Sequence, residues 1–143
     1  MIKRKIDTVI EEHFKSSRKA LFLTGARQSG KTYAIRKYAK NNGLNLVEVN
    51  FLLQPDSMAL FKGTRDVKDL LIRLSAYSDV NLEIGKTLVF LDEVQECPDV
   101  MTWVKALVEE GSYQYALSGS LLGVELKDIR SVPVGYMSEY QLY

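Results

Sequence analysis

The chain has 143 residues, enough for one domain with a continuous core and too few for two full domains. Hydrophobic residues make up 46% and charged residues 26%, with nine glycines and three prolines, so the composition excludes a disordered tail, a collagen and a disulfide scaffold. Lysine and arginine number 19 against 18 acidic residues, a net charge of +1. No apolar run reaches the roughly 18 residues of a membrane span and no signal peptide is evident, so we expect a cytoplasmic protein without membrane contact.

The single cysteine and the single histidine limit the metal and redox chemistry. Cys97 cannot form an internal disulfide, and His13 alone leaves no set of cysteines and histidines with zinc-ligand spacing. We therefore expect no structural zinc, a buried or loop thiol at Cys97 and a surface histidine at His13.

The charges are distributed unevenly along the chain. Residues 1–40 contain eleven basic and three acidic residues, a net charge of +8, whereas the remainder has a net charge of −7. Such an excess can attract nucleic acid, but a solvated helix face explains it at least as well. We expect no specific nucleic-acid binding by this chain.

Hydrophobic periodicity predicts helices and strands that alternate along the chain. Ile6, Ile10 and Phe14 recur at helical spacing, whereas Ala20–Thr24 and Thr87–Leu91 are short apolar runs typical of buried parallel strands. Alternating strands and helices predict an α/β fold with a parallel sheet and right-handed crossovers. In chain order we expect helix 2–17, strand 20–24, helix 32–39, strand 44–51, helices 56–62 and 66–78, strand 87–91, helix 98–111, and strands 113–117 and 136–142.

The first motif lies between the strand at 20–24 and the helix at 32–39. It fits the Walker A pattern G-x-x-x-x-G-K-[ST] at every fixed position, and it consists of Gly25, Ala26, Arg27, Gln28, Ser29, Gly30, Lys31 and Thr32. In this context the glycines let backbone N–H groups surround phosphates at the N-terminus of a helix. Lys31 is expected to reach the β- and γ-phosphates of ATP, and Thr32 to coordinate Mg²⁺. The plainer interpretation is a glycine-rich turn followed by a surface lysine.

The second motif is the pair Asp92-Glu93, which follows the apolar run 88–91 as a Walker B motif does. Ligands of open α/β sheets bind at the carboxyl ends of the strands, where this pair is expected. Asp92 can hold Mg²⁺, and Glu93 can orient and polarise the attacking water. Without the phosphate loop, the same pair would indicate only the polar end of a strand that leads into a loop.

With these motifs the chain resembles the N-terminal ATPase core of bacterial and archaeal AAA-type ATP-binding proteins that carry a C-terminal domain of unknown function. The resemblance extends from Arg4 to Tyr143, and it is specific in the first two of its three motifs. These motifs are Gly25-Ala-Arg-Gln28, Asp92-Glu-Val-Gln95 with Pro98, and Ser118-Gly119-Ser120.

The resemblance implies a P-loop NTPase of the additional-strand type, with five mostly parallel strands in the order 5-1-4-3-2 and helices on both faces. The strand at 113–117 would then lie between the strand of the phosphate loop and the strand that ends at Asp92. Either Ser118 or Ser120 would serve beside the γ-phosphate as a sensor, although Ser-Gly-Ser is also an ordinary turn. Tyr33, directly after the loop, is a further candidate for nucleotide contact.

Two departures from the family pattern concern an arginine and the end of the chain. AAA proteins usually need an arginine at the γ-phosphate, and the only arginine after Ser118-Gly119-Ser120 is Arg130, which could equally be a surface residue. Arg27 is prominent in the family's phosphate loop, but here it could equally be a solvated loop cation. The strand-like segment 136–143 ends without a turn or a polar tail, so we interpret the chain as a fragment that lacks a helical lid and is open to self-association.

Three classes of function are compatible with these residues. The favoured hypothesis is Mg²⁺-dependent ATP hydrolysis coupled to a conformational change in a partner or a C-terminal domain, slow in this fragment because no arginine is assured. The first alternative is a slowly hydrolysing, nucleotide-gated module that binds DNA or protein. The second is a small-molecule kinase, for which the phosphate loop alone would suffice.

Overall fold

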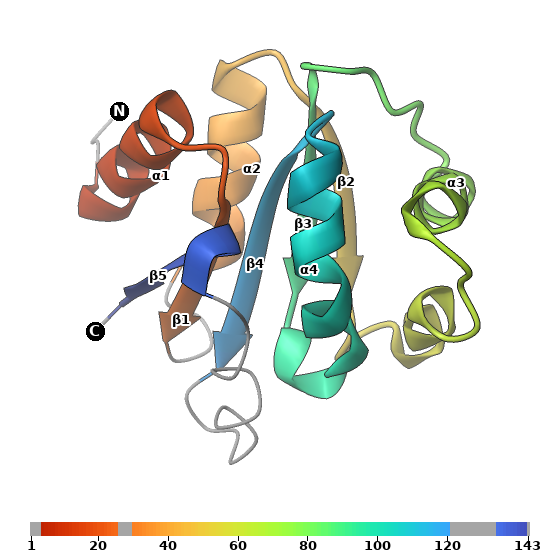
Figure 1. Ribbon diagram of the computed structural model, residues 1–143. Coiled ribbons are helices and arrows are strands. Elements are labelled where there is room, and N and C mark those ends of the chain that lie inside the picture. Colours follow the sequence, from red (N-terminus) through yellow and green to blue (C-terminus); the bar gives the residue numbers. More distant parts are fainter. Residues whose placement is uncertain (1–3, 26–29, 121–133, 143) are drawn as a thin grey trace.

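The computed structural model describes residues 4–25, 30–120 and 134–142 (Figure 1). Its centre is a five-stranded sheet in the order β2-β3-β4-β1-β5, in which every pair of neighbouring strands is parallel. This is the expected order 5-1-4-3-2, so the prediction that β4 separates β1 from β3 is confirmed. The strands are β1 (Ala20–Gly25), β2 (Asn45–Asn50), β3 (Thr87–Asp92), β4 (Gln114–Ser120) and β5 (Met137–Gln141).

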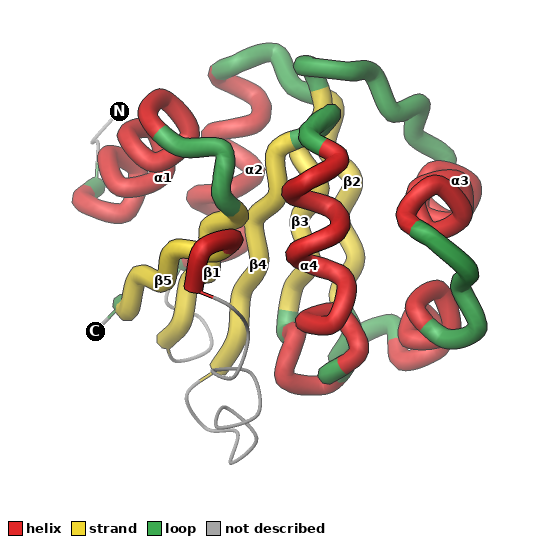
Figure 2. Tube along the Cα trace, in the orientation of Figure 1, coloured by secondary structure: helices red, strands yellow, loops and turns green. Residues whose placement is uncertain are grey.

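Helices cover both faces of the sheet, as Figure 2 shows for the α-helices. On one face α1 (Lys5–Ser16) and α2 (Lys31–Asn41) pack through residues such as Ile10 and Ile35 against Leu21, Leu23 and Phe90. On the other face α3 (Val67–Ser78) and α4 (Asp99–Glu110) pack against Phe22, Val89 and Leu91. Successive strand residues point to opposite faces, so the two clusters divide the apolar runs between them. None of the helices in the described ranges has the length and apolarity that a membrane span requires.

The element boundaries differ from the predicted ones in three informative places. Residues Pro55–Phe61 form a 3₁₀-helix, η1, instead of the expected α-helix, and the N–H of Ser57 donates to the carbonyl of Gln54 in the i→i+3 pattern. Strand β4 extends to Ser120, because the pairing with β1 continues as far as the partners Gly25 and Ser120. Ser118 and Ser120 therefore lie in a strand and not in the turn that the sequence allowed. Tyr136 belongs to a short 3₁₀-helix, η3 (Val134–Tyr136), and β5 begins only at Met137.

The topology brings the predicted motifs to one edge of the sheet. Because β1, β3 and β4 are parallel, their carboxyl ends meet where Gly25, Asp92 and Ser120 lie. Helix α2 begins at the same edge with Lys31, so the last two residues of the Walker A motif lie in its first turn. The fold thus provides a helix N-terminus and two polar strand ends in one place, as expected for open α/β sheets that bind ligands.

Candidate functional site

Lys31 is buried at the junction of α2 with two strand ends. Its Nζ donates to the carbonyl of Gly25 at 2.8 Å and to the carbonyl of Gly119 at 3.3 Å, so the ammonium group bridges the ends of β1 and β4. Gly30 precedes the helix with φ of +88°, a conformation that favours glycine. A buried cation beside a helix N-terminus is a favourable environment for a polyanion. The loop residues Ala26, Arg27, Gln28 and Ser29 lie outside the described residues.

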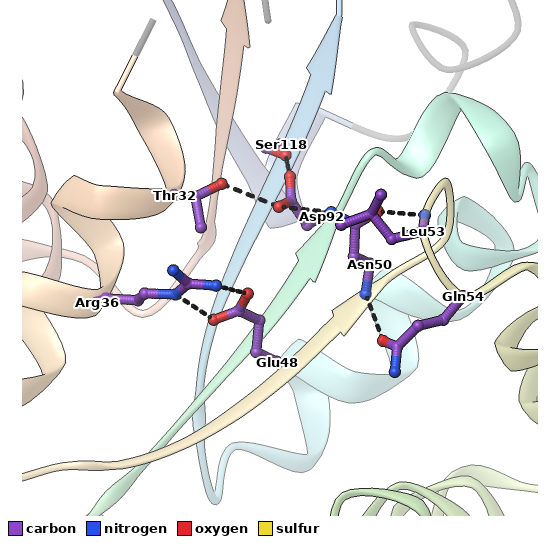
Figure 3. Close-up of polar contacts among 8 residues, drawn as sticks. All are labelled: Thr32, Arg36, Glu48, Asn50, Leu53, Gln54, Asp92 and Ser118. Atoms are coloured by element: carbon purple, nitrogen blue, oxygen red, sulfur yellow. Dashed lines mark hydrogen bonds and ion pairs between the residues drawn. The ribbon is translucent and has the colours of Figure 1, made fainter. Parts of the chain in front are cut away.

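Asp92 is buried and accepts hydrogen bonds from three side chains (Figure 3). Thr32 Oγ1 donates to Asp92 Oδ2 at 3.0 Å, and Asn50 Nδ2 approaches the same oxygen at 3.3 Å. The Ser118 hydroxyl donates to Oδ1. Burial raises the pKa of the Asp92 carboxyl above its ordinary value, and the hydrogen bonds from Ser118 and Thr32 oppose that rise. The first residue of the acidic pair is therefore fixed directly opposite the last residue of the phosphate loop.

Glu93 has an unusual backbone conformation for a non-glycine residue, with φ of 62° and ψ of 50°. Its N–H donates to Ser118 Oγ at 3.1 Å, and its Oε1 accepts from Gln95 Nε2 at 2.6 Å. Left-handed conformations at such residues cost free energy and cluster at functional sites. Here the turn directs the Glu93 side chain toward Gln95 while Asp92 remains with Thr32.

The two serines at the end of β4 contact different partners. Ser118 bonds to the Asp92 carboxylate and to the Glu93 N–H through one hydroxyl. Ser120 is buried and donates its backbone N–H to Gln95 Oε1 at 3.2 Å. Ser118 is therefore in direct contact with both acidic residues, a distinction between the serines that the sequence alone left open.

Tyr33 lies on the outer side of the first turn of α2, with 57% of its surface exposed. The guanidinium carbon of Arg4 is 5.5 Å from the centre of the Tyr33 ring, within the range of a cation–π contact. A Cβ placed on Gly30 would come within 2.6 Å of Arg4 Nη1, so the same guanidinium lies against the phosphate loop. No role for Arg4 follows from the sequence, because nothing in the local pattern shows that a residue before α1 folds back onto residue 30.

Several residues of the basic N-terminal third have partners inside the protein. Arg36 forms a two-pronged ion pair with Glu48 at 2.8 and 2.6 Å, beside the Asp92 cluster in Figure 3. Lys37 pairs with Asp7 at 2.6 Å. With Lys31 at the strand ends, these contacts engage part of the +8 charge within the protein and leave less of it available to a nucleic acid.

Cys97 and His13, from which no metal site was expected, differ in burial. Cys97 is buried, as predicted, and burial raises the pKa of its thiol to about 11. His13 is partly exposed on α1, in keeping with the prediction of a surface histidine; its Nε2 lies 2.6 Å from the carbonyl oxygen of Lys19 and its ring packs edge-on against Phe14. Burial lowers the pKa of His13 below its ordinary value.

A sequence model of the AAA domain matches residues 17–143. The chain belongs to the AAA domain family. Membership supports nucleotide binding and an AAA-type ATPase core, in agreement with the observed P-loop type of α/β sheet. The C-terminal domain of unknown function that the resemblance implied stays a prediction. No curated protein matches the chain.

The oxygen atoms around Asp92 fit the ligand preference of Mg²⁺. In the part of the chain that the structure describes, no three histidine, cysteine, aspartate or glutamate residues lie close enough to hold a metal by themselves. Mg²⁺ is commonly held by one or two carboxylates together with substrate phosphates and water. The Thr32 hydroxyl and the Asp92 carboxylate, 3.0 Å apart, fit a magnesium ion that arrives with a polyphosphate.

Proposed function

We propose that this AAA domain binds Mg²⁺–ATP at the carboxyl edge of the sheet and hydrolyses its β–γ phosphoanhydride. The observation that carries the proposal is the meeting of Lys31, Thr32, Asp92 and Glu93 at one point of the fold. They come from α2, the end of β3 and the residue after it, and only the fold brings them together. Separation of β1 from β3 by β4 argues against the kinase alternative, for which these two strands should be neighbours.

The proposed binding roles follow from charge and from hydrogen-bonding capacity. Lys31 neutralises the β- and γ-phosphates, and the N–H groups of the phosphate loop from Gly25 to Gly30 donate to their oxygens. Thr32 and Asp92 hold Mg²⁺, which when bound offsets negative charge on the phosphate oxygens. Tyr33 contacts the nucleotide from the outer side of the same helical turn, where the Tyr33 ring is exposed.

Glu93 is the proposed general base. Its carboxylate orients a water molecule and accepts a proton as the water oxygen bonds to the γ-phosphorus. The bond from that phosphorus to the β–γ bridging oxygen breaks, and ADP and inorganic phosphate leave. Ser118, in contact with Asp92 and Glu93, serves as the sensor of the γ-phosphate, and Ser120 lies two residues further along the same strand.

A second candidate function is a nucleotide-gated binding module that hydrolyses slowly. It requires that the hydrogen bond between Gln95 and Glu93 hold the base away from water, whereas the first candidate requires that this hydrogen bond orient the base toward water. Coupling to a partner and self-association stay predictions in both candidates, and Arg130 lies outside the described residues.

Calorimetric titration of Mg²⁺–ATP tests the proposed function by separating binding from chemistry. Lys31→Ala should lower the affinity at least tenfold, because it removes the cation that faces the phosphates. Glu93→Gln should bind within about twofold of the wild type, because it keeps the shape of the side chain and the metal ligands. Lys40→Ala, an exposed residue at the far end of α2, is the matched control and should bind normally. Equal loss of binding in Lys31→Ala and Glu93→Gln would contradict the assigned roles.

A further inference from the structure

Gln95 links the candidate base to the end of a different strand. It lies in the short 3₁₀-helix η2 (Val94–Glu96), and its side chain makes two hydrogen bonds in opposite directions. Nε2 donates to Glu93 Oε1 at 2.6 Å, and Oε1 accepts from the backbone N–H of Ser120 at 3.2 Å. The amide thus spans from the acidic pair after β3 to the last residue of β4.

The chemistry of the partners fixes the orientation of this amide. A backbone N–H can only donate, so the Ser120 side must receive the carbonyl oxygen of Gln95. The carboxylate of Glu93 accepts hydrogen bonds, so the other side must present the NH₂ group. Glu93 and Gln95 are buried, with 9% and 7% of their surfaces exposed, so loss of either hydrogen bond would leave a poorly hydrated polar group.

Close packing at Gly119 also limits where Gln95 can lie. A Cβ at Gly119 would meet the Phe22 ring at 3.2 Å and Gln95 Oε1 at 3.4 Å, so the strand end and the amide are in contact without spare room. Displacement of the β4 end relative to β3 would move the acceptor side of Gln95 and, through Nε2, the carboxylate of Glu93. The same strand end also receives the Lys31 ammonium at the Gly119 carbonyl.

We propose that Gln95 is a positioning residue for Glu93, which sets the orientation of the base and makes it depend on the position of the β4 end. The inference rests on the proposed function, because it assumes that Glu93 activates water. One carboxylate oxygen of Glu93 is held by Gln95, and this hydrogen bond restricts the rotation of the carboxylate that must face the water. General bases act only within about 2.6–3.2 Å of the proton that they accept, so a small rotation of this carboxylate decides the rate.

The test is a double-mutant cycle between Gln95→Met and Glu93→Gln. Methionine keeps the length of the side chain and removes both hydrogen bonds. The hydrolysis rate constant is measured in single turnovers with ATP labelled on the γ-phosphate, and the Kd of Mg²⁺–ATP is measured by calorimetry on the same proteins. Glu96→Gln is the matched control, because the Glu96 side chain lies in the same short helix η2 and makes no hydrogen bond within the described residues; it should change neither quantity.

We expect Gln95→Met to slow hydrolysis about 10- to 100-fold, the range typical of residues that orient a site residue, with the Kd unchanged within about twofold. In the Glu93→Gln background the same substitution should slow hydrolysis less than about twofold, because Gln95 then has no base to position. If Gln95→Met does not fold, Gln95→Glu keeps the shape and replaces the donor with a second carboxylate. It should slow hydrolysis by a similar factor.

Three results would overturn the inference. The first is an equal loss of rate from Gln95→Met in both backgrounds, which would show that Gln95 acts independently of Glu93. The second is an unchanged or faster rate in Gln95→Met, and the third is a loss of affinity as large as the loss of rate. A wild-type rate in Glu93→Gln alone would instead refute the proposed function, together with everything that rests on it.

Discussion

Removal of the Lys37 ammonium tests how α1 is held against the helix that follows the phosphate loop. Lys37 Nζ donates to Asp7 Oδ2 at 2.6 Å, and the N–H of Arg4 donates to the same oxygen at 2.9 Å. Asp7 Oδ1 is buried and has no hydrogen-bond partner among the described residues. Lys37→Met therefore leaves a buried carboxylate with a single neutral donor. The same carboxylate caps the start of α1, where Arg4 lies against Gly30.

The exposure of the two side chains sets the expected magnitude. Fully exposed ion pairs contribute about 0–1 kcal/mol, whereas removal of one partner from a buried pair costs about 3–5 kcal/mol. The Asp7 side chain is 4% exposed and that of Lys37 is 15% exposed, so the pair lies between these cases. We expect Lys37→Met to lower the free energy of unfolding by about 2 kcal/mol, which corresponds to roughly 8 °C in Tm for a domain of this size.

The pH dependence of this contribution follows from the pKa of Asp7. Burial raises that pKa, but the hydrogen bonds and charges of Lys37 and Arg4 outweigh burial and bring it below its ordinary value of 3.8. A carboxyl with a lowered pKa in the folded state stabilises the protein fully above its unfolded pKa, and the contribution is lost as the pH falls through the folded value. The stability difference between the wild type and Lys37→Met should therefore be constant near neutral pH and shrink below about pH 4.

Urea unfolding of the wild type, Lys37→Met, Asp7→Asn and the double variant gives the coupling energy of the pair. We expect the double variant to lose at least about 1 kcal/mol less than the sum of the single variants, because each single variant leaves one charged partner without the other. Lys40→Met, also on α2 but exposed, is the control for the loss of a lysine and should unfold like the wild type. Additive losses within about 0.3 kcal/mol would refute the assignment of this pair as the contact that holds α1.

Three further predictions concern other parts of the molecule. Asn50→Ala should lower the free energy of unfolding, measured by urea denaturation, by about 1–3 kcal/mol, because Asn50 donates to Asp92 and its Oδ1 accepts from the N–H groups of Leu52 and Leu53. A loss below about 0.5 kcal/mol would contradict this expectation. Cys97 should react with a thiol reagent at pH 8 only after unfolding, since it is buried and its thiol has a pKa of about 11; rapid labelling of the native protein would show otherwise. Duplex DNA should bind weakly and lose affinity steeply with salt in a fluorescence titration, and salt-resistant binding to one sequence would disprove the expectation.

The parts of the site that the sequence predicted are those encoded by short local patterns. The phosphate loop has fixed spacing, and the apolar run before Asp92 marks a buried strand whose end must lie at the carboxyl edge of a parallel sheet. These two signals were sufficient to bring Lys31, Thr32 and Asp92 together in the prediction, and the structure has them within one cluster. The order of the strands came from the resemblance to a family and not from periodicity.

The parts that the sequence did not predict depend on contacts between distant residues. Asn50 reaches Asp92 only because β2 pairs with β3 with Asn50 opposite Asp92, and no local pattern specifies that register. Gln95 reaches Ser120 because β4 continues three residues beyond its predicted end. Arg4 reaches Gly30 because α1 packs across α2, held by an ion pair between residues 30 positions apart. Side-chain chemistry alone cannot distinguish these residues from the other polar residues of the chain.

The nucleotide that remains bound after a single turnover tests the central claim most directly. Protein in excess is incubated with Mg²⁺ and a limiting amount of ATP labelled on the γ-phosphate, and the bound and released label are separated over time. This format detects even slow hydrolysis, because every bound ATP is followed to completion. The account predicts that the wild type releases labelled phosphate and retains ADP, whereas Glu93→Gln retains intact ATP for at least 100 times longer. Release of labelled phosphate at the same rate by both proteins, or no retention of ATP by either, would contradict it.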